Sequence, residues 1–182
     1  MHNIYFYPLS ISNQSLLVRI LNELKKIFNS HISIIDLNLD VESTRSIERN
    51  QYYSTKIIAE VLNHSTEYDG KILVLVDFDL YIPIFTYVFG EAQLNGKVSI
   101  VSLCRLYEEF YTGISNDELL FQRAMKEILH EIGHSFGLIH CSNWDCVMHS
   151  SAGIEEVDIK GNFYCKDCAL IIDEHINHKI TL

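Results

Sequence analysis

Three histidines and one glutamate stand at spacings that suit a catalytic metal site. His130 and His134 are four residues apart, so on a helix their side chains lie one turn apart on the same face and can bind one metal ion. Glu131 lies beside this pair, where it can act on a metal-activated water without being a ligand. A turn at Gly137 would bring His140 back to the same ion. Three imidazoles with an open fourth position are typical of a zinc hydrolase.

Four cysteines follow the last of these histidines and suit a second metal site. Cys141 and Cys146 form one close pair, and Cys165 and Cys168 form another. Two such pairs commonly hold a structural zinc ion in a closed tetrahedral shell. Two disulfides or inert buried thiols are the alternative, which a reducing compartment disfavours. The sequence therefore predicts two zinc ions per chain, and we expect the fifth cysteine, Cys104, to be a small core residue.

The metal-binding histidines are expected on a long helix. Ser115 and Glu118 have the spacing of a capping box at its start. Gly137 is suited to its end, because glycine adopts the left-handed conformation that stops a helix at little cost. The residues of its apolar face are Met125, Leu129, Ile132 and Phe136. This face would pack into the core and leave the opposite face to the chemistry.

Strands and helices alternate in the first half of the chain. The expected strands cover residues 4–9, 31–37 and 71–76, and the expected helices cover residues 13–29 and 50–63. This alternation indicates parallel strands joined by right-handed crossovers, with helices covering the sheet.

A hairpin is expected at the end of this sheet. Residues 87–94 and 97–103 flank Asn95 and Gly96, a dipeptide suited to a two-residue type I′ turn. If the second strand joins the parallel set, the first runs antiparallel at the edge, where an extended peptide can add. We therefore predict an α/β fold with a mixed, mostly parallel five-stranded sheet, an antiparallel edge strand and a small C-terminal lobe.

Length and composition favour one globular domain. The chain has 182 residues, of which 48% are apolar, and no repeat or Pro/Gly-rich linker divides it. We expect residues 1–182 to form a single domain, with an N-terminal subdomain at residues 1–137 and a zinc-stabilised C-terminal subdomain at residues 138–182. The formal net charge of −10 disfavours nucleic acid and anionic membranes as partners.

The N-terminal sequence indicates the cellular compartment in which the protein is expected. It lacks the basic, apolar and small-residue order of a signal peptide, and the longest apolar runs are too short to cross a bilayer. We therefore expect a cytoplasmic protein, and a monomer. The first strand begins near Ile4, so no covering propeptide is expected.

The combined motif resembles the archaemetzincins, a branch of the metzincin clan of zinc metalloproteases. In chain order it reads His130-Glu131-x-x-His134-x-x-Gly137-x-x-His140, Cys141-x4-Cys146-x-Met148 and Cys165-x-x-Cys168. The resemblance implies a metzincin-like α+β fold and places Met148 as the Met-turn residue beneath the catalytic zinc. It also makes the four cysteines the ligands of a structural zinc ion.

The activity implied is zinc-dependent hydrolysis of peptide bonds in peptide or protein substrates. Zinc would lower the pKa of its water toward about 7, and Glu131 would act as general base and then as general acid. One alternative is a non-catalytic or latent zinc-stabilised peptide-binding module on the same scaffold. Another is a zinc site with Glu155 as third ligand in place of His140. No oxyanion donor is evident, and the direction of Tyr164 cannot be read from its position.

Overall fold

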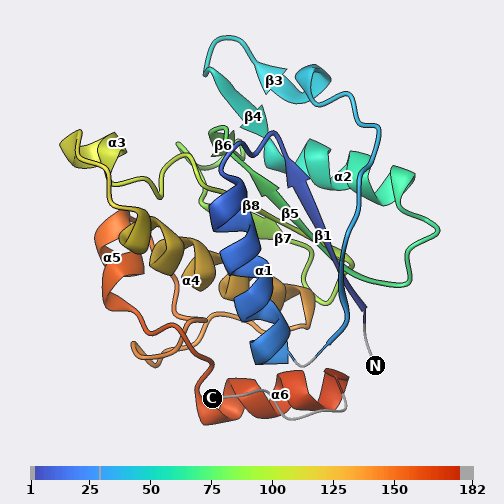
Figure 1. Ribbon diagram of the computed structural model, residues 1–182, viewed down its shortest axis with the longest axis vertical. Coiled ribbons are helices and arrows are strands. Elements are labelled where there is room, and N and C mark those ends of the chain that lie inside the picture. Colours follow the sequence, from blue (N-terminus) through green and yellow to red (C-terminus); the bar gives the residue numbers. More distant parts are fainter. Residues whose placement is uncertain (1–2, 29, 177–182) are drawn as a thin grey trace.

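The computed structural model of the chain describes residues 3–28 and 30–176. Its main sheet comprises β1 (Asn3–Leu9), β2 (Ile32–Ile34), β5 (Gly70–Val76), β7 (Gly90–Ala92) and β8 (Val98–Ser102). The spatial order is β2-β1-β5-β8-β7 (Figure 1). All neighbouring pairs are parallel except β7 and β8, which are antiparallel. The predicted mixed sheet with an antiparallel edge strand is therefore confirmed.

The central strand β5 explains why this sheet forms. Its residues from Ile72 to Val76 are all apolar and all buried, which is the pattern of a parallel strand covered on both faces. It pairs with β1 from Asn3 opposite Gly70 to Leu9 opposite Val76. Its other neighbour is β8, so this apolar strand lies at the centre of the sheet.

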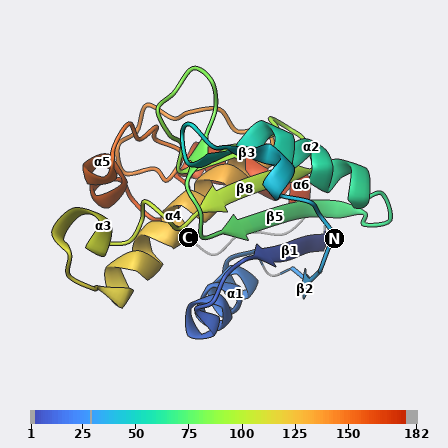
Figure 2. The same cartoon turned by 90° about the horizontal axis from the view of Figure 1, so that it is seen from above.

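Helices cover both faces of the sheet. The chain forms α1 (Gln14–Phe28), α2 (Ser54–His64) and α4 (Asp117–Ser135). The apolar side chains of α1 and α4 share one core cluster with one face of the sheet, and those of α2 share a second cluster with the other face. Figure 2 shows α1 and α2 on opposite sides of β1 and β5.

A second, small sheet was not predicted. It consists of β3 (Arg45–Ser46), β4 (Gln51–Tyr53) and β6 (Leu80–Tyr81), in the order β3-β4-β6. The helix expected at residues 50–63 was wrong at its start, because β4 pairs with β6 and the helix begins only at Ser54. A 3₁₀ turn, η1 (Glu42–Thr44), precedes this sheet.

The predicted hairpin forms, but its turn differs. β7 is shorter than residues 87–94, and the turn runs from Gln93 to Gly96, whose amide donates to the Gln93 carbonyl at 2.9 Å. Asn95 has a φ of 52°, whereas Gly96 is not at positive φ, so the type I′ turn was wrong. The reason is a tertiary contact: the Asn95 amide donates to the His134 carbonyl at 2.9 Å.

The start of α4 also differs by one residue, while its end is as predicted. Asn116, and not Ser115, is the N-cap, and its side chain accepts from the Leu119 amide at 3.0 Å. Glu118 instead forms an ion pair with Arg19. Gly137 has a φ of 92° and turns the chain after the helix.

The remaining helices lie around α4, and the one that carries Val157 and Asp158 contacts Arg123 and Lys126 in the first half of α4. They are α3 (Glu109–Thr112), α5 (Ile154–Ile159) and α6 (Lys166–Ile176). The apolar residues of α5 and α6 join the α1–α4 core cluster. Residues 177–182 of the predicted C-terminal subdomain lie outside the described residues. None of the described helices combines the length and apolarity that a bilayer crossing requires.

Candidate metal centre and active-site cleft

The structure brings His130, His134 and His140 together. The first two project from the same face of α4, and His140 returns to them after the turn at Gly137. One ring nitrogen from each lies within 4.8 Å of the others, a spacing at which they could hold one metal ion. His130 is buried, whereas His140 is exposed, so the group opens on one side.

Hydrogen bonds fix the tautomers of the two helical histidines. Nδ1 of His130 lies 2.8 Å from the Val147 carbonyl oxygen, and Nδ1 of His134 lies 2.7 Å from the Leu138 carbonyl oxygen. A carbonyl oxygen only accepts, so each Nδ1 must donate its proton. Burial lowers the pKa of both rings and keeps them neutral, which leaves each Nε2 with a lone pair.

These two lone pairs face each other, and that arrangement fits zinc. The Nε2 atoms of His130 and His134 are 3.0 Å apart. Two acceptors at this distance repel unless a cation lies between them. Zinc–nitrogen bonds of about 2.1 Å at a tetrahedral angle would separate two ligand nitrogens by about 3.4 Å. The donor set and its geometry therefore suit a zinc ion.

Glu131 is buried beside this group, against the edge strand of the sheet. A Cβ atom on Gly90 of β7 would lie 2.6 Å from Glu131 Cγ and 2.7 Å from its Oε1, so only glycine leaves room for this carboxylate. Burial raises the pKa of Glu131 well above its ordinary value, and the negative charge of Glu127 acts in the same direction. The ammonium of Lys160 opposes this increase.

Met148 lies under the histidine-bearing helix. It is fully buried, and a Cβ atom on Gly133 would overlap its Sδ atom. Tyr164 is packed at the same place, because the same Cβ would lie 3.2 Å from its Cε1. Its hydroxyl donates to the Leu129 carbonyl, so Tyr164 points into the core and does not line the cleft.

The four cysteines singled out by spacing also come together. Their Sγ atoms all lie within 4.8 Å of one another, and those of Cys141 and Cys165 are 3.9 Å apart. A disulfide requires about 2.05 Å, whereas zinc–sulfur bonds of about 2.3 Å place tetrahedral sulfurs about 3.8 Å apart. Cys104 lies outside this cluster, and burial raises the pKa of its thiol to about 11.

One short segment connects the two ligand groups. Val147 accepts the Nδ1 hydrogen bond from His130, and its neighbour Met148 accepts from the Cys141 amide at 2.9 Å. Cys146, the residue before Val147, belongs to the cysteine cluster. A shift of the cysteines would therefore move Val147 and with it the ring of His130.

A cleft of about 900 Å³ passes over the histidines. Its walls include β7 on one side and residues 149–152 after Met148 on the other. Glu127 and Lys160 also line it, and sequence reasoning missed both. Glu127 could have been found, because it precedes Glu131 by one helical turn, but nothing in the sequence marks Lys160. Glu155 is exposed, and the structure does not bring it to the histidines.

Comparison with known proteins identifies the family of this chain. The sequence model of peptidase family M54 matches residues 10–174. The chain belongs to this family. The archaemetzincin of Pyrococcus horikoshii is 40% identical over 130 residues, which cover 71% of this chain and 69% of that protein.

Two solved structures show the same fold as this M54 family member. The crystal structure of archaemetzincin from Archaeoglobus fulgidus, complexed with malonate, has a TM-score of 0.81 and 34% identity, and the match covers 93% of this chain and 99% of that chain. Archaemetzincin from Methanopyrus kandleri has a TM-score of 0.83 and 28% identity, with 97% and 96% covered. The resemblance to archaemetzincins is confirmed, and the chain is a zinc metallopeptidase by family.

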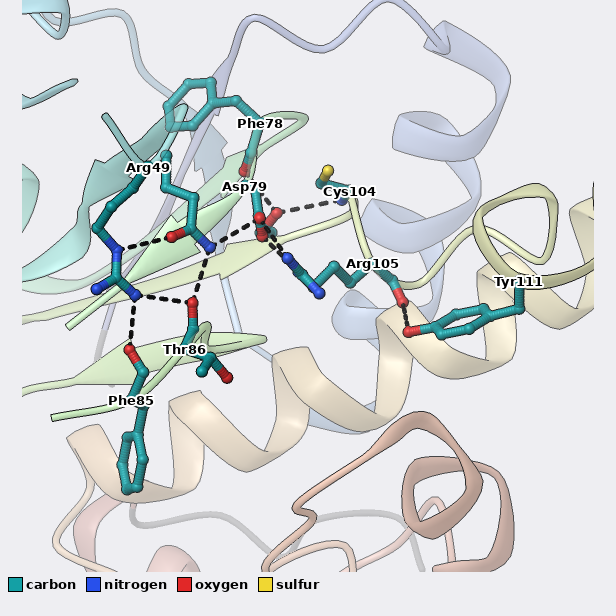
Figure 3. A network of polar contacts seen from close by, with 10 residues as sticks. Arg49, Phe78, Asp79, Phe85, Thr86, Cys104, Arg105 and Tyr111 are labelled. Atoms are coloured by element: carbon teal, nitrogen blue, oxygen red, sulfur yellow. Dashed lines mark hydrogen bonds and ion pairs between the residues drawn. The ribbon is translucent and has the colours of Figure 1, made fainter. Parts of the chain in front are cut away.

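A polar network holds the cleft wall of this M54 peptidase on the side of β7 (Figure 3). Arg49 donates to the Phe85 and Thr86 carbonyls at 2.8 and 2.9 Å. Gln51 donates to the Thr86 carbonyl and to Asp79, at 2.9 and 2.8 Å. Asp79 also accepts two hydrogen bonds from Arg105, each at 2.7 Å. Two of the carbonyls that this network fixes belong to residues that line the cleft.

Proposed function

We propose that this chain hydrolyses peptide bonds with a zinc ion held by His130, His134 and His140 and with Glu131 as the proton-transferring residue. The observation that carries the proposal is the 3.0 Å approach of the His130 and His134 Nε2 atoms beside a buried carboxylate. Bound zinc would polarise the scissile carbonyl and lower the pKa of a water molecule.

Glu131 has the surroundings that its role requires. As general base it takes a proton from the attacking water, and as general acid it returns that proton to the leaving amine. Burial raises the pKa of Glu131, which strengthens its carboxylate as an acceptor for the proton of the attacking water. Gly90 leaves the space that this carboxylate occupies beside the edge strand.

The substrate is proposed to bind as an extended strand along β7. This strand ends the sheet, and Gly90, Glu91 and Ala92 all line the cleft. A peptide added there would exchange backbone hydrogen bonds with the sheet edge and pass over the histidines. Residues 87–94 were expected to form this edge, and the segment from Tyr87 to Ala92 lines the cleft although only Gly90–Ala92 is a strand.

A second, structural zinc ion is proposed at Cys141, Cys146, Cys165 and Cys168. Four thiolates close the coordination shell and leave no position for substrate. This ion would tie the C-terminal subdomain, residues 138–182, to the N-terminal subdomain, residues 1–137, through the contact between Val147 and His130. Sulfur atoms at metal-binding distances also support a reducing, cytoplasmic location, and we expect the chain to act as a monomer.

A peptide-library cleavage assay on zinc-loaded protein tests the proposed function. The wild-type chain should cleave peptides, and the Glu131→Ala variant should bind zinc without cleaving. The library also distinguishes an active peptidase from a latent peptide-binding module, since only the former generates new peptide termini. Absence of cleavage by zinc-loaded wild-type protein would favour the module.

A further inference from the structure

Glu127 and Lys160 form a buried ion pair in the active-site cleft. Lys160 Nζ lies 2.8 Å from Glu127 Oε1, and the two side chains are 1% and 5% exposed, respectively. Both line the cleft that also contains His130 and Glu131. Glu127 precedes Glu131 by one helical turn, on the same face of α4. The proposed hydrolytic steps use neither member of this pair.

The pair retains unused hydrogen-bonding capacity. An ammonium has three N–H groups, and beyond Glu127 the contact of Lys160 is the His149 carbonyl at 3.5 Å. Among residues 3–28 and 30–176, the buried hydroxyl of Ser151, which also lines the cleft, has no hydrogen-bond partner. Buried polar groups are normally satisfied. The unused N–H groups of Lys160 and the Ser151 hydroxyl therefore point to a polar ligand group in this cleft.

The charges of the pair restrict what that group can be. A cationic substrate side chain would meet the ammonium of Lys160, and an anionic one would meet the carboxylate of Glu127. An apolar side chain would displace water and leave these groups unpaired. A carboxamide carries N–H donors and a carbonyl acceptor on one planar group, so it can donate to Glu127 and accept from Lys160 together.

We infer that the Glu127–Lys160 pair is a specificity determinant that selects peptides with a neutral side-chain amide, glutamine or asparagine, near the scissile bond. This inference rests on the proposed peptidase function and adds the substrate class.

Cleavage of matched peptides tests the inference on the full, zinc-loaded chain. The peptides differ only in glutamine or leucine at one position, and each position around the cleaved bond is tested in turn. At one position, glutamine should raise kcat/KM by about tenfold or more, because a site built to form hydrogen bonds discriminates against an analogue that lacks them. The Glu127→Gln/Lys160→Met double variant should lose this preference. It removes both charges together and so leaves no unpaired buried charge.

The matched control is Glu155→Gln. It makes the same chemical change on the same lobe, at an exposed residue outside the cleft, and should keep the glutamine preference. Equal cleavage of both peptides by wild type at every position, or a preference for leucine, would overturn the inference. An unchanged glutamine preference in the double variant would overturn it as well.

A binding measurement separates this inference from the proposed function. Peptidyl hydroxamates with a glutamine or a leucine side chain bind a zinc site without being cleaved, and their affinities for wild-type protein can be compared by calorimetry. Tighter binding of the glutamine compound, by about tenfold, supports the inference even if the double variant does not fold. Equal binding contradicts it. Selective binding without any peptide cleavage would refute the proposed function alone, and cleavage without selectivity would refute this inference alone.

Discussion

Gly90 of β7 and Glu131 of α4 are in direct contact, with no room for a side chain between them. A Cβ atom on Gly90 would lie 2.6 Å from Glu131 Cγ and 2.7 Å from Glu131 Oε1. The edge strand that borders the cleft therefore also positions the carboxylate proposed to transfer protons. In the proposed mechanism, substrate binding and proton transfer both depend on Gly90, a residue that carries no chemistry of its own.

Replacing Gly90 by alanine should lower kcat and leave the zinc content unchanged. The added methyl group must displace Glu131, which is not a ligand in the proposed site. Loss of a positioned general base costs about 10²-fold or more. Steady-state kinetics together with metal analysis would measure both quantities. A Gly90→Ala variant with wild-type kcat would show that this contact is not needed for catalysis.

Gly133 and Met148 should behave as an energetically coupled pair. The methyl group of Gly133→Ala would overlap Met148 Sδ, and such overpacking costs about 1–3 kcal/mol of the free energy of unfolding. Met148→Ala alone creates a cavity, whereas the double variant should be more stable than the sum of the single changes predicts. Chemical denaturation of the four proteins gives the coupling energy. Additive effects would contradict the packing described.

Cys165→Ser should remove one of two zinc ions and lower the melting temperature sharply. Structural zinc contributes about 10 kcal/mol or more of binding free energy to small zinc domains. Because Val147 bonds His130 and adjoins Cys146, the remaining zinc should also become easier to chelate. Cys104→Ser is the control, since Cys104 lies outside the cluster, and it should change neither zinc content nor lability. A measured content of only one zinc ion per wild-type chain would contradict the proposed structural zinc site.

Arg49→Met should raise KM more than it lowers kcat. Arg49 fixes the Phe85 and Thr86 carbonyls in the cleft wall but does not lie among the histidines and Glu131. Loss of charge-assisted hydrogen bonds should weaken substrate binding by about tenfold. Arg45→Met, in β3 just before the turn that carries Arg49 and bonded to Asn50, should leave KM unchanged. A loss confined to kcat would indicate that the wall acts on the chemical step instead.

The arrangement of the main sheet, mostly parallel with an antiparallel edge strand, and the two groups of residues that could hold metal ions could be predicted from the sequence. The long apolar run of β5 and the spacing of His130 and His134 are local signals, and local patterns are what a sequence displays directly. The edge position of β7 was predicted from the hairpin, because β8 joins the parallel strands on one side and pairs with β7 on the other.

The remaining features depend on contacts between distant segments. Asn95 adopts its turn because its amide bonds the end of α4, which the Asn-Gly dipeptide alone does not reveal. β4 forms because it pairs with β6, which lies more than twenty residues away in the chain. Lys160 reaches Glu127 from the end of α5, and no spacing rule connects them.

The most direct test of the account is the Glu131→Ala variant, assayed for peptide cleavage and for zinc content in the same preparation. The account predicts two zinc ions per chain, as in wild type, and a loss of cleavage of about 10²-fold to 10⁴-fold or more. Loss of a zinc ion would show that Glu131 is a ligand, and cleavage at the wild-type rate would show that another residue transfers the proton. Either result would contradict the proposed mechanism.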